Sequence, residues 1–146
     1  METSCGFIVY FKPENKIVLG APPNSTVWSI PKGRKDESEN NIQAALRELY
    51  EESNIPRNFI DSSDVYHLTP RKYKGRNKEL VPFLCVTEVE PINLKCNSFF
   101  TQDGVEYPEF SIIRLIAVDD ILSGKITVHH TQLEAIKEAM KLAQTL

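Results

Sequence analysis

Three glutamates stand close together, at positions 48, 51 and 52. On a helix, residues at i, i+3 and i+4 share a face, so these carboxylates would converge. Like charges at such spacings destabilise a helix by about 0.2–0.5 kcal/mol per pair. Carboxylate oxygens suit hard cations, and Mg²⁺ typically combines one or two carboxylates with substrate phosphates. The cluster therefore indicates either a cation site or a solvated acidic face, and the glutamates alone do not decide between them.

A helix that would carry these glutamates is predicted from its start and its apolar face. Asn40 and Gln43 resemble a capping box, which predicts a helix that runs to about Ser53. Ile42, Leu46 and Leu49 recur at helical spacing. We therefore expect this apolar stripe to pack on the body and the three glutamates to lie on the side away from it.

The remaining elements alternate between strands and irregular segments. Thr131 and Glu134 resemble a second capping box, opening a helix that runs close to Leu146. Pro82 weakens one strand prediction or places that strand on an edge. Residues 91–108 form a long polar connection with little periodicity. Apolar, β-branched and aromatic runs predict strands over residues 5–11, 16–19, 27–30, 65–73, 80–89 and 110–118. Strands mixed with two helices predict an α/β sandwich, a mixed sheet with helices on its faces.

Composition and charge limit the broad class. The 146 residues are 41% hydrophobic and 25% charged, which predicts one globular domain over residues 1–146. The net charge of −3 gives no global positive field, so we do not expect a nucleic-acid partner. No long apolar run or signal peptide is recognisable, and the three cysteines lack metal-like spacing. We expect free thiols in a cytoplasmic, monomeric protein without membrane contact.

The spacing around the glutamates resembles the signature of the Nudix family, Gly-x5-Glu-x7-Arg-Glu-U-x-Glu-Glu-x-Gly-U, where U is a bulky aliphatic residue. One defined position departs from this pattern, because Asn54 stands where the family has glycine. In the family this residue ends the helix, and asparagine is the next best residue for a left-handed cap, so we expect the geometry to survive. The matching positions are Gly33, Glu39, Arg47, Glu48, Leu49, Glu51, Glu52 and Ile55.

The resemblance implies a Nudix α/β/α sandwich in which the signature forms a loop–helix–loop and a further helix lies at the C-terminus. It also implies Mg²⁺- or Mn²⁺-dependent hydrolysis of a nucleoside diphosphate linked to another moiety. A carboxylate, Glu48 or Glu52, would take the proton of the attacking water. Glu39 and Arg47 would buttress the loop as an ion pair. The implied metal ligands are the Gly33 carbonyl and the carboxylates of Glu48, Glu51 and Glu52.

Four stretches outside the signature are similar to the asymmetrical diadenosine tetraphosphate hydrolases. Residues 28–33, WSIPKG, look like the W-x-x-P-K-G segment of these enzymes, and residues 4–10 are similar to their first strand. Residues 73–78, YKGRNK, look like their Y-x-x-R-N-K segment. In this subfamily a glutamate ahead of a later strand joins the metal site and the catalytic set. Glu109 fits that place better than Glu106.

A tetraphosphate carries about four negative charges and needs cations beyond the metals. Tyr73 could stack on adenine or could be a half-buried strand residue. Phe99 or Phe100, in the long connection, could stack on the second base or tuck into the core. His129 and His130 are expected at the surface or at a helix entry. The candidate phosphate-binding residues are Lys32, Arg34, Lys74, Arg76 and Lys78.

Three functions follow as hypotheses. The first is hydrolysis of diadenosine tetraphosphate to ATP and AMP. The second keeps the enzyme class and changes the substrate to a diphosphoinositol polyphosphate or to capped or 5′-triphosphate RNA. The third is a non-catalytic Nudix module that binds a nucleotide, although the intact glutamate set argues against it.

Overall fold

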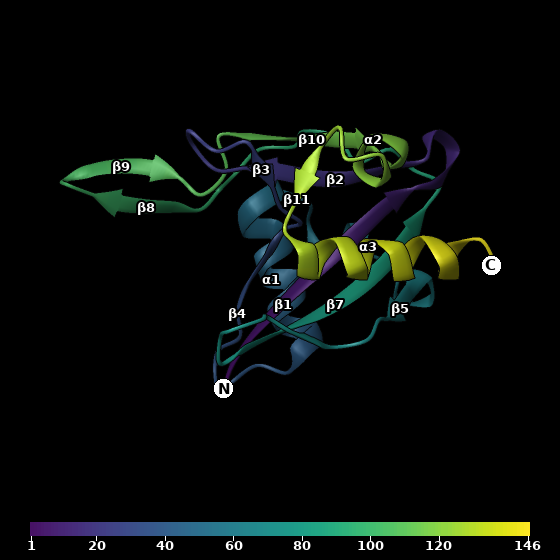
Figure 1. Ribbon diagram of the computed structural model, residues 1–146, viewed down its shortest axis with the longest axis horizontal. Helices are drawn as coiled ribbons and strands as arrows, with labels where there is room; N and C mark the ends of the chain where they lie inside the picture. Colours follow the sequence, from purple (N-terminus) through teal and green to yellow (C-terminus); the bar gives the residue numbers. More distant parts are fainter.

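The computed structural model describes residues 1–146 and is built on a seven-stranded sheet (Figure 1). The strand order is β10–β2–β1–β7–β5, with β4 also pairing with β1 and β6 with β7. β1 and β7 are parallel and the other pairs are antiparallel, so the sheet is mixed, as predicted. The strands are Glu2–Phe11 (β1), Lys16–Ala21 (β2), Lys32–Arg34 (β4), Val65–His67 (β5), Arg71–Lys72 (β6), Lys78–Thr87 (β7) and Ile112–Ala117 (β10).

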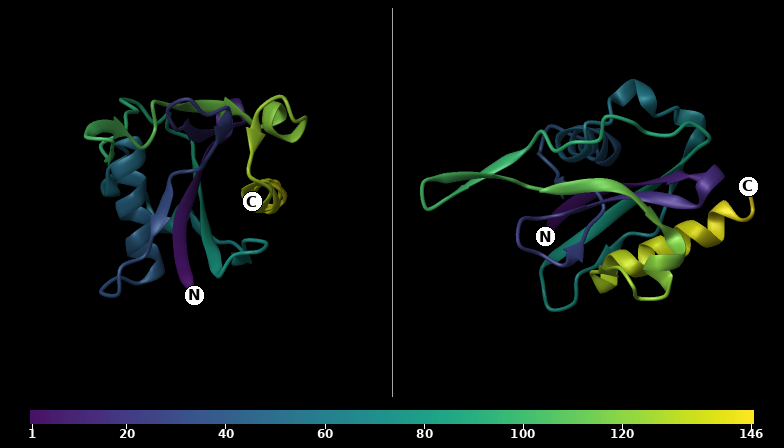
Figure 2. Two further views of the ribbon diagram at one scale, coloured as in Figure 1. Left: turned by 60° about the vertical axis from the view of Figure 1, so that its left-hand side comes forward. Right: turned by 90° about the horizontal axis from the view of Figure 1, so that it is seen from above.

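Two helices cover opposite faces of this sheet (Figure 2). They are α1, Asn41–Ser53, and α3, His130–Ala143, so the predicted sandwich is confirmed. The shorter elements are the 3₁₀ turns Lys12–Glu14, Arg57–Phe59 and Ser62–Asp64, the helix Val118–Leu122 (α2), and the strand pairs Val27–Trp28 (β3) with Thr127–Val128 (β11) and Phe99–Gln102 (β8) with Val105–Pro108 (β9). No helix has the length and apolar character needed to cross a membrane.

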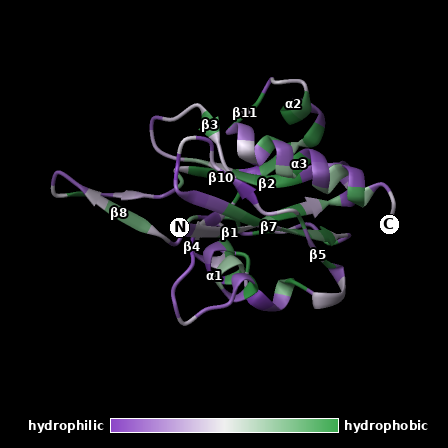
Figure 3. Cartoon of the chain, turned by 60° about the horizontal axis from the view of Figure 1, so that its bottom comes forward, coloured by the Kyte–Doolittle hydropathy of each residue, from purple (hydrophilic) through white to green (hydrophobic).

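The central strands separate two hydrophobic cores. Along β1, Phe7 and Val9 face the α1 side, whereas Ile8 faces the α3 side. This division follows from the two-residue period of a strand, which sends successive side chains to opposite faces. Figure 3 shows hydrophobic residues on the central strands between α1 and α3. Both helices are therefore fixed to the sheet by burial of apolar side chains.

The prediction that Pro82 weakens its strand or leaves it on an edge is wrong. Pro82 lies within β7, which pairs with β1 on one side and with β5 and β6 on the other. It stands opposite the break between β5 and β6, where its carbonyl accepts a hydrogen bond from Leu68 N at 3.2 Å. The interrupted neighbouring strand accommodates a residue that has no N–H group.

The segment 91–108 differs from the long irregular connection that the sequence predicts. Its second half forms the hairpin β8–β9, which projects from the body as a green arm (Figure 1). Most of its residues are exposed, with Phe99 at 55% and Val105 at 50% of their full accessible surface. An exposed hairpin has no apolar-in, polar-out alternation, and this explains why its strands give no pattern in the sequence.

The start of α3 also differs from its prediction, because Thr131 and Glu134 form no capping box. The N-cap residue is His129, whose Nδ1 accepts a hydrogen bond from Thr131 N at 3.2 Å. Thr131 is buried inside the first turn of the helix. A histidine ring therefore takes the place of the hydroxyl that would normally accept from a free N–H group.

Candidate active site

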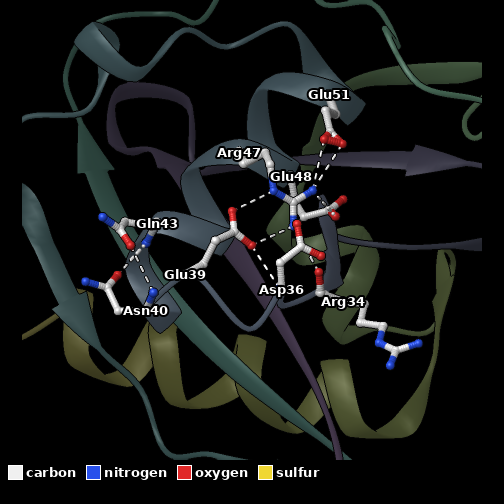
Figure 4. Close-up of polar contacts among 8 residues, drawn as sticks. All are labelled: Arg34, Asp36, Glu39, Asn40, Gln43, Arg47, Glu48 and Glu51. Atoms are coloured by element: carbon white, nitrogen blue, oxygen red, sulfur yellow. Dashed lines mark hydrogen bonds and ion pairs between the residues drawn. The ribbon is translucent and has the colours of Figure 1, made fainter.

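The loop before α1 is fixed by one arginine (Figure 4). Arg47 Nε donates to Glu39 Oε2 at 2.7 Å and its Nη2 donates to Glu39 Oε1 at 2.9 Å, so the expected ion pair is present. Arg47 also donates to the Arg34 carbonyl, to Glu48 Oε1 and to both Glu51 oxygens. The guanidinium lowers the pKa of Glu39 to about 2, helped by the Asp36 N–H. Arg47 thus joins the loop to the first two glutamates of the cluster.

Glu48 packs directly on Gly33 in β4. A Cβ atom at Gly33 would overlap the Glu48 carboxylate, so only glycine permits this approach. The Glu48 side chain is 12% exposed, and burial, followed by the charge of Glu51, raises its pKa. Any larger residue at position 33 would therefore displace the Glu48 carboxylate from this position.

Glu52 is a buried carboxylate with 9% of its surface exposed. Its only hydrogen bond is from Lys32 N to Oε1, at 2.9 Å. Burial is the main cause that raises the pKa of Glu52 to about 8; the charges of Glu48 and Glu109 add to this rise, and the hydrogen bond from Lys32 N opposes it. The prediction that all three glutamates lie on the side of the helix away from the body is wrong for Glu48 and Glu52, because α1 turns both toward β4.

Glu52 lines a cleft of about 370 Å³. The cleft brings it together with Glu109, which precedes β10, and with three cationic side chains, Lys32, Arg76 and Lys78. Burial and the nearby Lys78 lower the pKa of Lys32. Anionic and cationic groups from opposite ends of the sequence thus line one concave surface, which is a suitable place for a polyanion with a counter-ion.

A family model described as the NUDIX domain matches residues 6–136. The chain belongs to the Nudix family. The protein is a Nudix hydrolase that acts on phosphoric anhydride bonds.

Similar proteins of known sequence include an RNA pyrophosphohydrolase of Cereibacter sphaeroides strain KD131, 28% identical over 82% of this chain and 78% of that protein. The mRNA-decapping enzyme subunit 2 of Saccharomyces cerevisiae is 29% identical over 74% of this chain but only 11% of that protein. Among solved structures, a C. elegans Ap4A hydrolase in a binary complex has a TM-score of 0.72 at 18% identity and covers 100% of both chains. The NUDIX domain of Shewanella oneidensis NrtR with ADP ribose has a TM-score of 0.70 at 15% identity, covering 97% of this chain and 86% of that one. These structures support the Nudix fold.

Several predicted residues of the Nudix site do not line the cleft. The Arg34 side chain points away from the Arg47 network in Figure 4, and Lys74 is exposed at a turn. The Glu51 carboxylate instead accepts hydrogen bonds from Arg47. Glu106, the alternative to Glu109, is exposed on β9.

The three aromatic candidates have different surroundings. Tyr73 lines the cleft but is buried, with the His129 ring 5.3 Å and Lys78 Nζ 5.1 Å from its ring centroid. Phe100 lies on the hairpin and packs against Tyr107, with 5.8 Å between the ring centroids. Phe99 is on the opposite face of the hairpin, because adjacent strand residues point to opposite sides. Of these rings, Tyr73 has the least free face for stacking.

Two residues at the start of α3 also line the cleft and were not predicted as site residues. Gln132 is 3% exposed, accepts from Ile30 N at 2.9 Å and donates to Ser29 Oγ at 3.0 Å. It therefore fixes the segment that leads into β4. His129 has a pKa lowered by burial and by the nearby Arg76 charge. A polar residue on the apolar face of a helix is the only sequence signal for Gln132.

The donor set fits a divalent cation. Carboxylates and a backbone carbonyl are hard oxygen ligands, and the Glu52 carboxylate is buried with one hydrogen bond and no cation bonded to it. No three acidic, histidine or cysteine side chains are gathered closely enough to enclose a metal ion, and Glu48 and Glu51 are both bonded to Arg47. The residues that would hold the ion are Glu52 and Glu109, which line the cleft, together with Glu48, because the charges of Glu48 and Glu109 both raise the pKa of Glu52.

Proposed function

We propose that the protein hydrolyses a 5′-linked nucleoside polyphosphate with the help of Mg²⁺ or Mn²⁺, and that diadenosine tetraphosphate is its substrate. The observation that carries this proposal is the cleft in which Glu52 and Glu109 meet Lys32, Arg76 and Lys78. The carboxylates suit the cation, and the three basic side chains suit the charges of a phosphate chain that the cation leaves uncompensated.

The reaction is attack by water on a phosphorus atom. A new P–O bond forms to the water oxygen, the bridging P–O bond breaks, and the bridging oxygen leaves with the other phosphate product. When bound, the cation would neutralise developing charge and acidify the water. Glu52 or Glu48 accepts the proton of the water, and Glu109 contributes a further carboxylate. Lys32, Arg76 and Lys78 hold the phosphates in place.

A second nucleoside distinguishes the proposed substrate from a simple nucleotide. Phe100 and Tyr107 share one face of the hairpin and border a hollow of about 210 Å³ with Pro23 and Asn24. The neighbouring residues of that loop, Pro22 and Ser25, line the cleft. We assign the distal base to this aromatic face, because stacking on an aromatic ring is worth about 1–3 kcal/mol per base.

A 5′-triphosphate RNA is the second candidate substrate. It is favoured by the 28% identity to an RNA pyrophosphohydrolase over most of both chains. Both candidates present a 5′-polyphosphate to the same cleft, and an RNA would place its second nucleotide, rather than a second adenosine, beyond the phosphates. The acidic net charge of −3 favours the small substrate.

The test is hydrolysis of diadenosine tetraphosphate with Mg²⁺ in ¹⁸O-labelled water, in parallel with a 5′-triphosphorylated oligonucleotide. The expected products are ATP and AMP, and the labelled product locates the attacked phosphorus. Phe100→Ala should raise KM for diadenosine tetraphosphate, with Phe99→Ala as the matched control. Faster turnover of the oligonucleotide would replace the proposed substrate, and no turnover of either would contradict the proposal.

A further inference from the structure

The departure from the Nudix signature, Asn54, makes hydrogen bonds that the family's glycine could not make. Its backbone is left-handed, with φ 65° and ψ 13°, and its N–H donates to the Tyr50 carbonyl at 2.9 Å, as a helix cap requires. Its side chain donates from Nδ2 to the Asn93 carbonyl at 2.9 Å and accepts at Oδ1 from Asn97 Nδ2 at 2.9 Å. Asparagine thus keeps the backbone cap and adds two side-chain hydrogen bonds.

These two hydrogen bonds attach residues 93–98, which we call the strap, to the C-terminal end of α1. The last carbonyls of a helix lack partners within it. Strap atoms supply them: Asn97 N donates to the Glu51 carbonyl at 2.6 Å, and Lys95 N donates to the Ser53 carbonyl at 3.3 Å. Asn97 Nδ2 also donates to the Tyr50 carbonyl at 3.2 Å. The strap is therefore built onto the turn of α1 that carries Glu51 and Glu52.

The other end of the strap reaches the segment that carries Glu109. Glu109 N donates to the Ser98 carbonyl at 2.9 Å, and Phe110 N donates to Cys96 Sγ at 3.4 Å. Cys96 Sγ donates in turn to the Ser98 carbonyl at 3.2 Å. Hydrogen bonds thus join Asn54 to Asn93 and Asn97 in the strap, and Ser98 at the end of the strap to the backbone of Glu109.

We infer that Asn54 is a positioning residue for Glu109. Its side chain fixes the strap to α1, and the strap fixes Glu109 in the cleft with Glu52. Glu109 stands far from α1 in the sequence, at the base of an exposed hairpin, and the strap supplies the hydrogen bonds between its backbone segment and the end of α1. The inference rests on the proposed function in one respect, because it takes Glu109 to be part of the cation site.

The test is Asn54→Gly, which restores the residue of the family pattern. Glycine keeps the left-handed cap and removes both side-chain hydrogen bonds. In metal-free protein, amide hydrogen exchange should become faster at Asn97 and Glu109. Outer-shell changes typically cost about 10–100-fold in metal affinity or activity, and we expect losses of that size in Mn²⁺ affinity and in kcat.

Two controls separate positioning from general destabilisation. Asn15→Gly replaces another asparagine with a left-handed backbone, at φ 54°. The Asn15 side chain accepts a hydrogen bond from Tyr10 Oη, with 2.7 Å between the oxygen atoms, and this pair does not line the cleft. Asn15→Gly should leave exchange at Glu109 and Mn²⁺ affinity unchanged at a temperature where both variants are folded. In a Glu109→Gln background, Asn54→Gly should cause little further loss, because residues that act through one another are not additive.

The inference is overturned if Asn54→Gly leaves exchange at Glu109 unchanged, or if it lowers Mn²⁺ affinity and kcat equally in the presence and absence of the Glu109 carboxylate. It is also overturned if Glu109→Gln binds Mn²⁺ as the wild type does. The exchange measurement needs no substrate, so a failure of the proposed hydrolysis would be recognised separately by an inactive wild-type enzyme with an intact strap.

Discussion

Glu39 and Glu52 belong to the same signature and end in opposite electrostatic states. Both oxygens of Glu39 accept hydrogen bonds from Arg47, and its pKa falls to about 2. Glu52 is buried with a single backbone N–H as its partner, and its pKa rises to about 8. One carboxylate is satisfied within the protein, whereas the other is not.

This difference assigns separate tasks to the two ends of α1. The Arg47 network determines the path of the loop and brings Gly33 against Glu48. The Glu52 carboxylate has one hydrogen bond within the protein and remains able to bind a ligand. Carboxylates in clefts with strongly shifted pKa values are typical of functional sites. Arg47 offsets the charges of Glu48 and Glu51, and a bound cation is expected to offset the charge of Glu52.

The largest expected effect is on the unsatisfied side. Glu52→Gln should lower kcat/KM for diadenosine tetraphosphate on the order of a thousandfold or more. The variant would lose several kcal/mol of transition-state charge stabilisation, and each 1.36 kcal/mol corresponds to a tenfold change in rate. Steady-state kinetics at saturating Mg²⁺ checks this. Glu37→Gln, an exposed acid in the loop before α1, is the matched control and should retain full activity. Equal activity of Glu52→Gln and Glu37→Gln would show that Glu52 has no special role in the reaction.

A smaller effect, on stability, is expected on the satisfied side. Arg47→Met should lower the free energy of unfolding by about 2 kcal/mol, because Glu39, Glu48 and Glu51 lose their shared partner in a half-buried network. Urea denaturation measures the change. Arg57→Met, at an exposed arginine without an ion pair, should change stability little. A stable Arg47→Met protein would mean that the loop holds its shape without the network.

The smallest effects lie in the pH dependence of stability of the metal-free protein. Glu39 has a lowered pKa, so its contribution is present above its unfolded value of about 4.3 and is lost as the pH falls toward 2. Glu52 has a raised pKa, so the folded state loses stability as the pH rises from about 4.3 to about 8. In thermal unfolding from pH 3 to pH 9, the unfolding temperature of Glu39→Gln should fall relative to that of the wild type as the pH rises. The unfolding temperature of Glu52→Gln should rise relative to that of the wild type. Parallel curves for the two variants would contradict the assigned states.

The sequence predicted the local parts of this site well. The Asn40–Gln43 capping box and the left-handed Asn54 cap both depend on residues within one helical turn, and both are present. The Glu39–Arg47 pair was predicted through the family signature. These features could be predicted because short spacing, or a known pattern, fixes which groups meet.

The parts that could not be predicted depend on distant segments. Gln132 reaches Ile30 across 102 positions of sequence, and nothing near either residue indicates that contact. The hairpin β8–β9 is exposed on both faces, so it leaves no periodic pattern. Pro82 lies inside the sheet only because the neighbouring strand is interrupted beside it.

The protonation state of Glu52 before metal binding can be measured from the number of protons that are released when Mn²⁺ binds. Calorimetric titration at pH 7 in buffers of different ionisation enthalpy gives this number. Because Glu52 with a pKa of about 8 is largely protonated at pH 7, we expect the wild type to release close to one proton and Glu52→Gln to release none. Binding of Mn²⁺ without proton release, or with equal release in Glu52→Gln, would contradict the claim that Glu52 is held for the cation.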